Sequence, residues 1–84
     1  MIKNKTTLLT IDIGSNAMRA TFYQKRGRNF LAVLNRRYPL RLGQEVFSTG
    51  KIGVEKKLEL TNAIKELWHI CYRHNVLHVL AVGT

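Results

Sequence analysis

Two stretches of alternating residues, separated by a short break, constrain the fold of this chain most strongly. Between Thr7 and Ile13 apolar side chains recur at every second position, and the same alternation returns from Met18 to Gln24 after a break at Gly14-Ser15-Asn16. A period of two is typical of a half-buried β-strand. Because so few residues separate the two stretches, the pattern predicts two antiparallel strands joined by a tight turn.

The residues that follow extend this hairpin into a meander. Lys25-Arg26-Gly27-Arg28 supplies a second turn, and Asn29–Arg37 is rich in Phe, Leu and Val, which predicts a third antiparallel strand. Pro39 ends regular pairing because it has no N–H to donate. Glycines at positions 43, 50 and 53 predict that the next stretch is a loop.

From Val54 the period changes to that of a helix. The spacing predicts a helix of about 20 residues that stops at Asn75. The apolar run Val76–Val82 lacks clean alternation and predicts a strand buried on both faces. Apolar residues of the helix recur at steps of four, three and four, at Leu60, Ile64, Leu67 and Cys71.

A helix between an earlier strand and a later one indicates a crossover connection. The predicted fold class is therefore α/β, with a three-stranded antiparallel meander, one long helix and then a parallel strand. Phe22, Phe30 and Trp68 are predicted to lie in its core.

Charge gives the first indication of a partner. The 84 residues are enough for one small domain, and 14 Lys and Arg against 5 Asp and Glu give a net charge of +9. Between Lys25 and Arg41 no acidic residue occurs, which favours polyanionic partners such as nucleic acid, polyphosphate or nucleotides. A solvated basic face explains the same charge run without any site.

Other features narrow the class of protein. No apolar run reaches the roughly 18 residues of a membrane span, and Asp12 interrupts the start before a signal-peptide core forms, so we expect a cytoplasmic protein without membrane contact. Cys71 is the single cysteine, which excludes an internal disulfide. His69, Cys71, His74 and His78 lie on different faces or elements and do not predict a metal cluster.

The predicted turn after Ile13 carries residue types that suit phosphate. Gly14 lets the following backbone N–H groups approach an anion, Ser15 and Asn16 add side-chain donors, and the planar fork of Arg19 can hold two phosphate oxygens. Asp12 would repel phosphate directly, so its expected task is to hold Mg²⁺. The alternative is a plain tight hairpin, since Asp, Gly, Ser and Asn are all common turn residues.

The order of motifs resembles one known family. Asp12-Ile13-Gly14-Ser15-Asn16 with Arg19 looks like the first phosphate-binding hairpin of the exopolyphosphatase and guanosine pentaphosphate phosphatase (Ppx/GppA) family, a branch of the actin-like ATPase superfamily. Arg41-Leu42-Gly43, Thr49-Gly50-Lys51-Ile52 and the terminal stretch His78–Thr84 follow in the order typical of that family. One departure is Ala17, where the family usually has a second Ser.

The resemblance implies a ribonuclease H-like (actin-like ATPase) half-domain, with residues 1–84 as the N-terminal portion of the family's first lobe and an incomplete domain. It implies phosphate binding by Gly14, Ser15, Asn16, Arg19 and Thr84, Mg²⁺ at Asp12, and no catalytic residue in this chain. The resemblance implies that the second glycine-rich loop and the catalytic Glu of the family belong to a later part of the complete protein. The complete protein is expected to release terminal phosphate from polyphosphate or pppGpp.

Two consequences and two alternatives follow. The isolated chain is expected to be inactive, and its partners are the missing C-terminal part of the same fold or a second copy in a homodimer, because the terminal strand leaves an apolar edge uncovered. The alternatives are a lobe of another actin-like ATPase or kinase, and a basic module that binds nucleic acid or a protein partner. Tyr23 and Tyr38 are poor support for the latter, because no spaced aromatic platform accompanies them.

Overall fold

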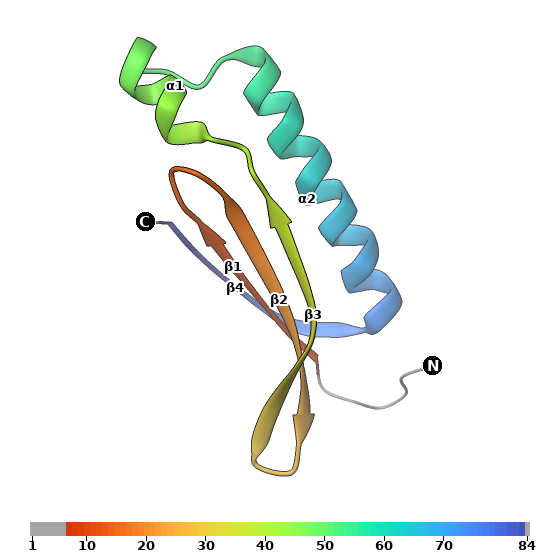
Figure 1. Ribbon diagram of the computed structural model, residues 1–84. Coiled ribbons are helices and arrows are strands. Elements are labelled where there is room, and N and C mark those ends of the chain that lie inside the picture. The colour runs from red at the N-terminus through yellow and green to blue at the C-terminus, as the bar shows by residue number, and fades with distance from the viewer. Residues whose placement is uncertain (1–6, 84) are drawn as a thin grey trace.

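The protein consists of one four-stranded sheet with a long helix across one face (Figure 1). The computed structural model describes residues 7–83. Its strands and helices, in chain order, are β1 (Thr7–Ile13), β2 (Met18–Arg26), β3 (Asn29–Tyr38), α1 (Leu42–Thr49), α2 (Val54–His74) and β4 (Val76–Gly83).

The sheet has the strand order β3-β2-β1-β4. β1 pairs antiparallel with β2 and parallel with β4, and β3 pairs antiparallel with β2. The connection from β3 to β4 therefore crosses the sheet through α2, as the sequence predicts. The antiparallel meander, the long helix and the parallel strand are all confirmed, and β1 has the predicted bounds.

The core lies between α2 and the face of the sheet that it covers. Leu9, Met18 and Phe22 are at most 1% exposed on the sheet side, and α2 contributes Ala63, Leu67 and Ile70. Burying a side chain the size of Leu or Phe contributes about 1.5–3 kcal/mol each. Phe22 thus occupies the core as predicted.

The helix presents a different face to the core than the spacing of its larger residues indicates. Ile64 is 39% exposed and Trp68 is 73% exposed, whereas Leu67 is 2% exposed. The prediction of Trp68 in the core is wrong, because that side of α2 extends towards β4 and no further strand lies beneath it in the described residues.

Phe30 is also wrongly assigned to the core, since it is 49% exposed. β1 begins at Thr7, opposite Gln24, so β2 and β3 continue past it as a two-stranded ribbon (Figure 1). Phe30 pairs with Lys25 in this ribbon, outside the layer that α2 covers.

The predicted loop after Pro39 contains a helix, α1, so that prediction is also wrong. Gly50 adopts φ 74° and its N–H donates to the carbonyl oxygen of Val46 at 2.7 Å. A glycine in the left-handed region commonly ends a helix. The glycine signal therefore marks the end of α1 and does not exclude the helix before it.

β4 forms where predicted but is not buried on both faces. It pairs only with β1, and four of its apolar side chains are at least half exposed: Leu77, Val79, Leu80 and Val82.

None of the helices in residues 7–83 is long and apolar enough to cross a membrane.

Candidate functional site

The turn between β1 and β2 presents polar groups at one end of the sheet. The N–H of Gly14 donates to the carbonyl oxygen of Ala17 at 2.9 Å, which closes the turn and leaves Ser15 and Asn16 exposed. No described residue accepts a hydrogen bond from the main-chain N–H of Ser15 or Asn16. Two adjacent N–H groups in a turn form a small concavity that suits an anion.

The segment between β3 and α1 fixes this turn from behind. The N–H of Arg41 donates to the carbonyl oxygen of Asn16, and the N–H of Gly43 donates to that of Ser15, both at 2.9 Å. Gly43 approaches so closely that an added Cβ would lie 2.4 Å from the Cβ of Ser15. The turn is therefore held by two main-chain hydrogen bonds and by a contact that only glycine permits.

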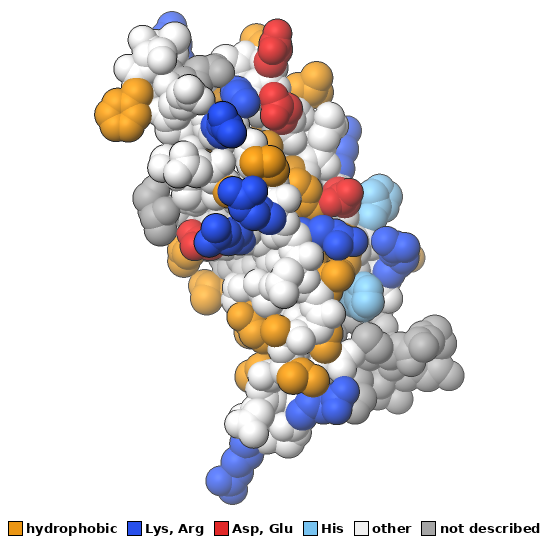
Figure 2. Space-filling model, in the orientation of Figure 1, with side chains coloured by type: hydrophobic (Ala, Val, Ile, Leu, Met, Phe, Trp, Pro, Cys, Tyr) orange, Lys and Arg blue, Asp and Glu red, His pale blue; other side chains and the backbone are white. Residues whose placement is uncertain are grey.

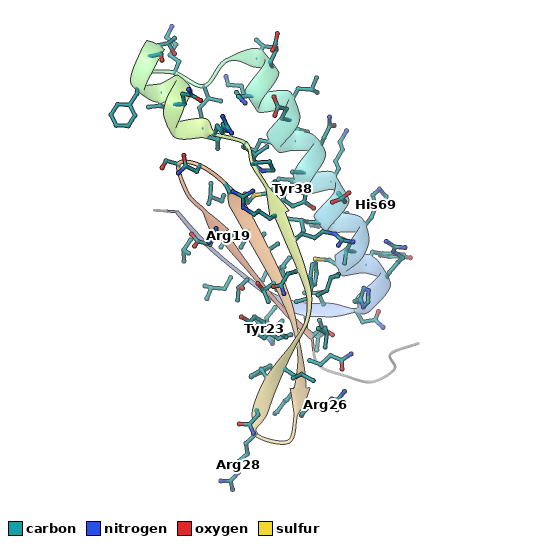
Figure 3. The ribbon with its side chains drawn as sticks, viewed as in Figure 1. Arg19, Tyr23, Arg26, Arg28, Tyr38 and His69 are labelled. Atoms are coloured by element: carbon teal, nitrogen blue, oxygen red, sulfur yellow. The ribbon has the colours of Figure 1, made fainter. Side chains whose placement is uncertain are left out.

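A row of three charged residues crosses the sheet just below the turn. Asp12 on β1 is opposite Arg19 on β2, and Arg19 is opposite Arg37 on β3. Figure 3 labels Arg19 on β2, on the turn side of Tyr23. All three side chains are exposed. The ion pair found among the described residues lies elsewhere, between Lys56 Nζ and Glu59 Oε2 at 3.7 Å. Neither arginine is paired with a carboxylate of a described side chain.

Two adjoining recesses lie around the turn. The smaller has a volume of about 330 Å³ and the larger about 530 Å³. Ser15, Asn16 and Arg37 line both. The smaller recess is completed by Asp12, Gly14, Ala17 and Arg19, and the larger by Pro39, Arg41, Gly43, Gln44 and Phe47.

The smaller recess collects most of the residues that the sequence singled out: Asp12, Gly14, Ser15, Asn16 and Arg19. Whether they bind phosphate or a metal ion stays a prediction. Thr84 lies outside the described residues. Ala17, the departure from the family pattern, also lines this recess.

Sequence reasoning missed Arg37 and Arg41 as members of the site. It treated Arg36 and Arg37 as one basic run, but neighbouring residues of a strand point to opposite faces. Arg36 lines a separate hollow with Ile70 and Arg73 on the α2 side. Counting the register back from the second turn without a bulge would pair Arg19 with Arg36, and the bulge at Phe22/Tyr23 moves the partner to Arg37, so the sequence offered no signal that locates Arg37.

The end of β3 next to the site is attached to α2. The Tyr38 hydroxyl donates a hydrogen bond to Oε1 of Glu66. Partial burial raises the pKa of Tyr38 well above its usual value, and the hydrogen bond and the negative charge of Glu66 raise it further. The phenol is therefore a neutral donor at physiological pH.

Comparison with solved structures identifies close matches in fold. The crystal structure of the Aquifex aeolicus member of the Ppx/GppA protein family superposes with a TM-score of 0.87 and 28% identity, over 94% of this chain and 26% of that one. An exopolyphosphatase from Cytophaga hutchinsonii superposes with a TM-score of 0.83 and 23% identity, over 93% of this chain and 25% of that one. The chain thus has the actin-like ATPase fold of these structures and spans about a quarter of their length.

A second structure of the Aquifex aeolicus Ppx/GppA phosphatase, its type II variant, gives a TM-score of 0.86 at 27% identity over 93% of this chain and 26% of that one. Comparisons with protein-family models and with curated protein sequences gave no match. The similarity is therefore found by comparison of structures.

Proposed function

Because the chain shares the fold of the Ppx/GppA phosphatase family along nearly its whole length, we propose that it is the phosphate-binding N-terminal portion of the first lobe of such a phosphatase. The complete protein would release terminal phosphate from polyphosphate or pppGpp. The observation that carries this proposal is the smaller recess, where the exposed turn and Arg19 converge beside one carboxylate.

The turn and Arg19 bind the phosphoryl group in this proposal. The N–H groups of Ser15 and Asn16 donate to its oxygens, and the Arg19 guanidinium holds two oxygens at once. Each charge-assisted hydrogen bond contributes about 1.5–3 kcal/mol, but ordering the ligand offsets much of that gain. The chain alone should therefore bind orthophosphate with an affinity in the millimolar range, about −4 kcal/mol.

Asp12 fits the task of holding Mg²⁺ beside the phosphoryl group. It is an exposed carboxylate in the recess, and Mg²⁺ is usually held by one or two carboxylates together with phosphate oxygens. Among the described residues no group of three His, Cys, Asp or Glu comes together, so Asp12 would act with the substrate's oxygens. When bound, the ion neutralises charge on the phosphates.

This chain contributes binding and orientation of the phosphate rather than activation of water. Phosphoryl transfer depends on positioning groups on both sides of the phosphorus, and the recess offers them on one side. We therefore expect no measurable release of phosphate from polyphosphate by the isolated chain. Turnover by the pure chain that Asp12→Ala abolishes would contradict this assignment.

An orthophosphate titration followed by amide NMR shifts tests the proposed site. We expect the shifts to concentrate at residues 14–17, and Arg19→Lys to weaken binding by roughly tenfold, because lysine keeps the charge and loses the fork. Arg28→Lys is the matched control, since Arg28 lies at the far tip of the β2–β3 ribbon (Figure 3).

The alternatives predict other results in the same titration. A basic module that binds by diffuse charge would respond equally to both arginine variants and would lose affinity steeply as salt rises. A lobe of another actin-like ATPase or kinase would keep the phosphate site, and would be distinguished by phosphoryl transfer to an acceptor other than water in the complete protein.

A further inference from the structure

The larger recess beside the phosphate turn has the character of a second anion site. It is lined by Arg37 and Arg41 and by no Asp or Glu among the described residues. It also shares Ser15, Asn16 and Arg37 with the smaller recess, so the two spaces adjoin at the turn. In Figure 2, Lys and Arg side chains gather on the visible face over the end of β3 that leads to α1.

The pairing of Arg19 with Arg37 needs an explanation outside the fold. Like charges directly opposite on neighbouring strands destabilise a sheet, and Asp12 lies beyond Arg19, on the side away from Arg37. An anion between the two guanidinium groups would remove this repulsion. Arg37 lines both recesses, so an anion there would be shared between them.

Arg41 adopts a conformation that an arginine rarely takes. Its φ is 54° and its ψ is 44°, in the left-handed region where glycine is favoured and other residues are strained. The hydrogen bond from its N–H to Asn16 holds it there. Local strain of this kind persists at functional sites when the side chain is needed, and this side chain lines the larger recess.

From these observations we propose that the larger recess binds the second and following phosphoryl groups of a linear phosphate chain whose end lies in the smaller recess. Arg37 contacts the junction and Arg41 contacts the more distant groups. This inference rests on the proposed function of the smaller recess, and it assigns the preference for a run of consecutive phosphates to residues of this chain.

A run of phosphates can come from inorganic polyphosphate or from a nucleoside 5′-triphosphate. Phe47 lines the larger recess and is 93% exposed, so a nucleobase would have an aromatic face available for stacking. Tripolyphosphate and GTP are therefore the two probes. If Phe47→Ala weakens the binding of GTP and not that of tripolyphosphate, the recess binds a nucleotide. If it changes neither affinity, the recess binds phosphates only.

The test compares orthophosphate with tripolyphosphate on the whole chain, by amide shifts and by equilibrium dialysis at fixed ionic strength. We expect tripolyphosphate to bind at least about tenfold more tightly and to shift Gln44 and Phe47 in addition to the turn. Arg41→Gly removes the guanidinium and keeps a backbone that glycine favours. It should reduce the tripolyphosphate affinity by about fivefold and the orthophosphate affinity by a smaller factor.

Arg37→Ala and Arg36→Ala form a charge-matched pair on opposite faces of the sheet. Arg37→Ala should reduce the affinity for tripolyphosphate by about tenfold, and Arg36→Ala should reduce it by less than about twofold. Equal effects of the two variants, or a tripolyphosphate affinity unaffected by Arg41→Gly, would overturn the proposal while the orthophosphate site stands. Absence of orthophosphate shifts at the turn would instead contradict the proposed function itself.

Discussion

The turn end of the sheet and the surface formed by β4 with the adjoining side of α2 present opposite kinds of side chain to water. At the turn end, exposed groups are charged or polar, and two main-chain hydrogen bonds from the segment before α1 fix them. Along β4 and the adjoining side of α2, exposed groups are apolar, and the free edge of β4 has no hydrogen-bonded neighbour in the described residues. The first region offers hydrogen-bond donors and positive charge to an anion, whereas the second exposes an apolar surface and a strand edge of the kind that pairs with a partner.

The apolar region has a defined shape. A groove of about 480 Å³ lies between α2 and β4. Burial raises the pKa of the Cys71 thiol, which keeps this side chain neutral in the groove. The lining residues are Leu9, Ile11, Ile64, Leu67, Trp68, Cys71, Tyr72, Val76 and Val79. We propose that the remaining part of the family fold covers this groove in a complete protein, and that in the isolated chain a second copy does so.

Gly43→Ala has the largest expected effect, and it tests whether close packing of this glycine positions the turn. The added Cβ would lie 2.4 Å from Ser15 Cβ and 3.1 Å from Ser15 Cα, so the turn and the start of α1 must separate. We expect a loss of about 1–3 kcal/mol in the free energy of unfolding and loss of the orthophosphate-induced shifts at the turn. Urea denaturation and the NMR titration measure the two effects.

Ser15→Gly in the same chain is the control for that clash. Removing the Ser15 Cβ eliminates the shortest contact, although the Ser15 carbonyl oxygen would still lie 3.3 Å from the new Cβ. The double variant should recover part of the stability lost by Gly43→Ala. If Gly43→Ala binds phosphate as well as the parent chain, close packing of this glycine does not position the turn.

The second test addresses the apolar region. Leu80 is 59% exposed on β4, and a charge on an edge strand opposes pairing with another chain. We expect the isolated chain to self-associate at micromolar concentration and Leu80→Lys to weaken that association by at least about tenfold. Analytical ultracentrifugation measures it.

Val54→Lys provides the matched control, since Val54 is 83% exposed at the start of α2 and lies outside β4. It adds the same charge and removes an apolar side chain that is also exposed. Equal dissociation by both variants would mean that net charge governs the association, and a parent chain that remains monomeric would show that the edge needs no partner.

The sequence predicted the parts of the fold that depend on local pattern. Alternation located β1 and the turn, and the change of period located α2 with its stop at Asn75, which has the left-handed φ of 52° expected of a helix C-cap. It failed where the outcome depends on which neighbours are present. The apolar character of Trp68 and of Val76–Val82 predicts burial. In the described residues, however, no strand pairs with the outer edge of β4, and most of these side chains are exposed.

The site was predictable where its residues are consecutive and not where the chain brings them from different strands. Asp12 to Arg19 form a single hairpin, so one motif contains them. Arg37 and Arg41 join the site through the pairing of β2 with β3 and through the hydrogen bond from Arg41 to Asn16. The residue that lies opposite another on a neighbouring strand depends on the register of the two strands, and a bulge at Phe22/Tyr23 shifts the register of β2 with β3. Composition does not contain this information, so it assigned both arginines to a diffuse basic surface.

The smallest expected effect concerns the hydrogen bond that attaches β3 to α2 between the two regions. Tyr38→Phe removes only the hydroxyl that donates to Glu66, so we expect a loss of about 0.5–1.5 kcal/mol in the free energy of unfolding at pH 7. The orthophosphate-induced amide shifts at the turn and the self-association through β4 should both be unchanged, because neither region includes this hydroxyl.

The pH dependence of that loss identifies the neutral Tyr38 hydroxyl as its cause. The folded-state pKa of Tyr38 is raised above its ordinary value of 10.0, so its contribution is fully present below pH 10 and disappears as the pH rises through the folded-state pKa. The difference in stability between the parent chain and Tyr38→Phe should therefore be constant from pH 7 to about pH 9 and shrink above about pH 10. Urea denaturation of both chains across this range measures it. A difference that persists undiminished at higher pH would assign the effect to packing of the Tyr38 ring environment rather than to the hydroxyl.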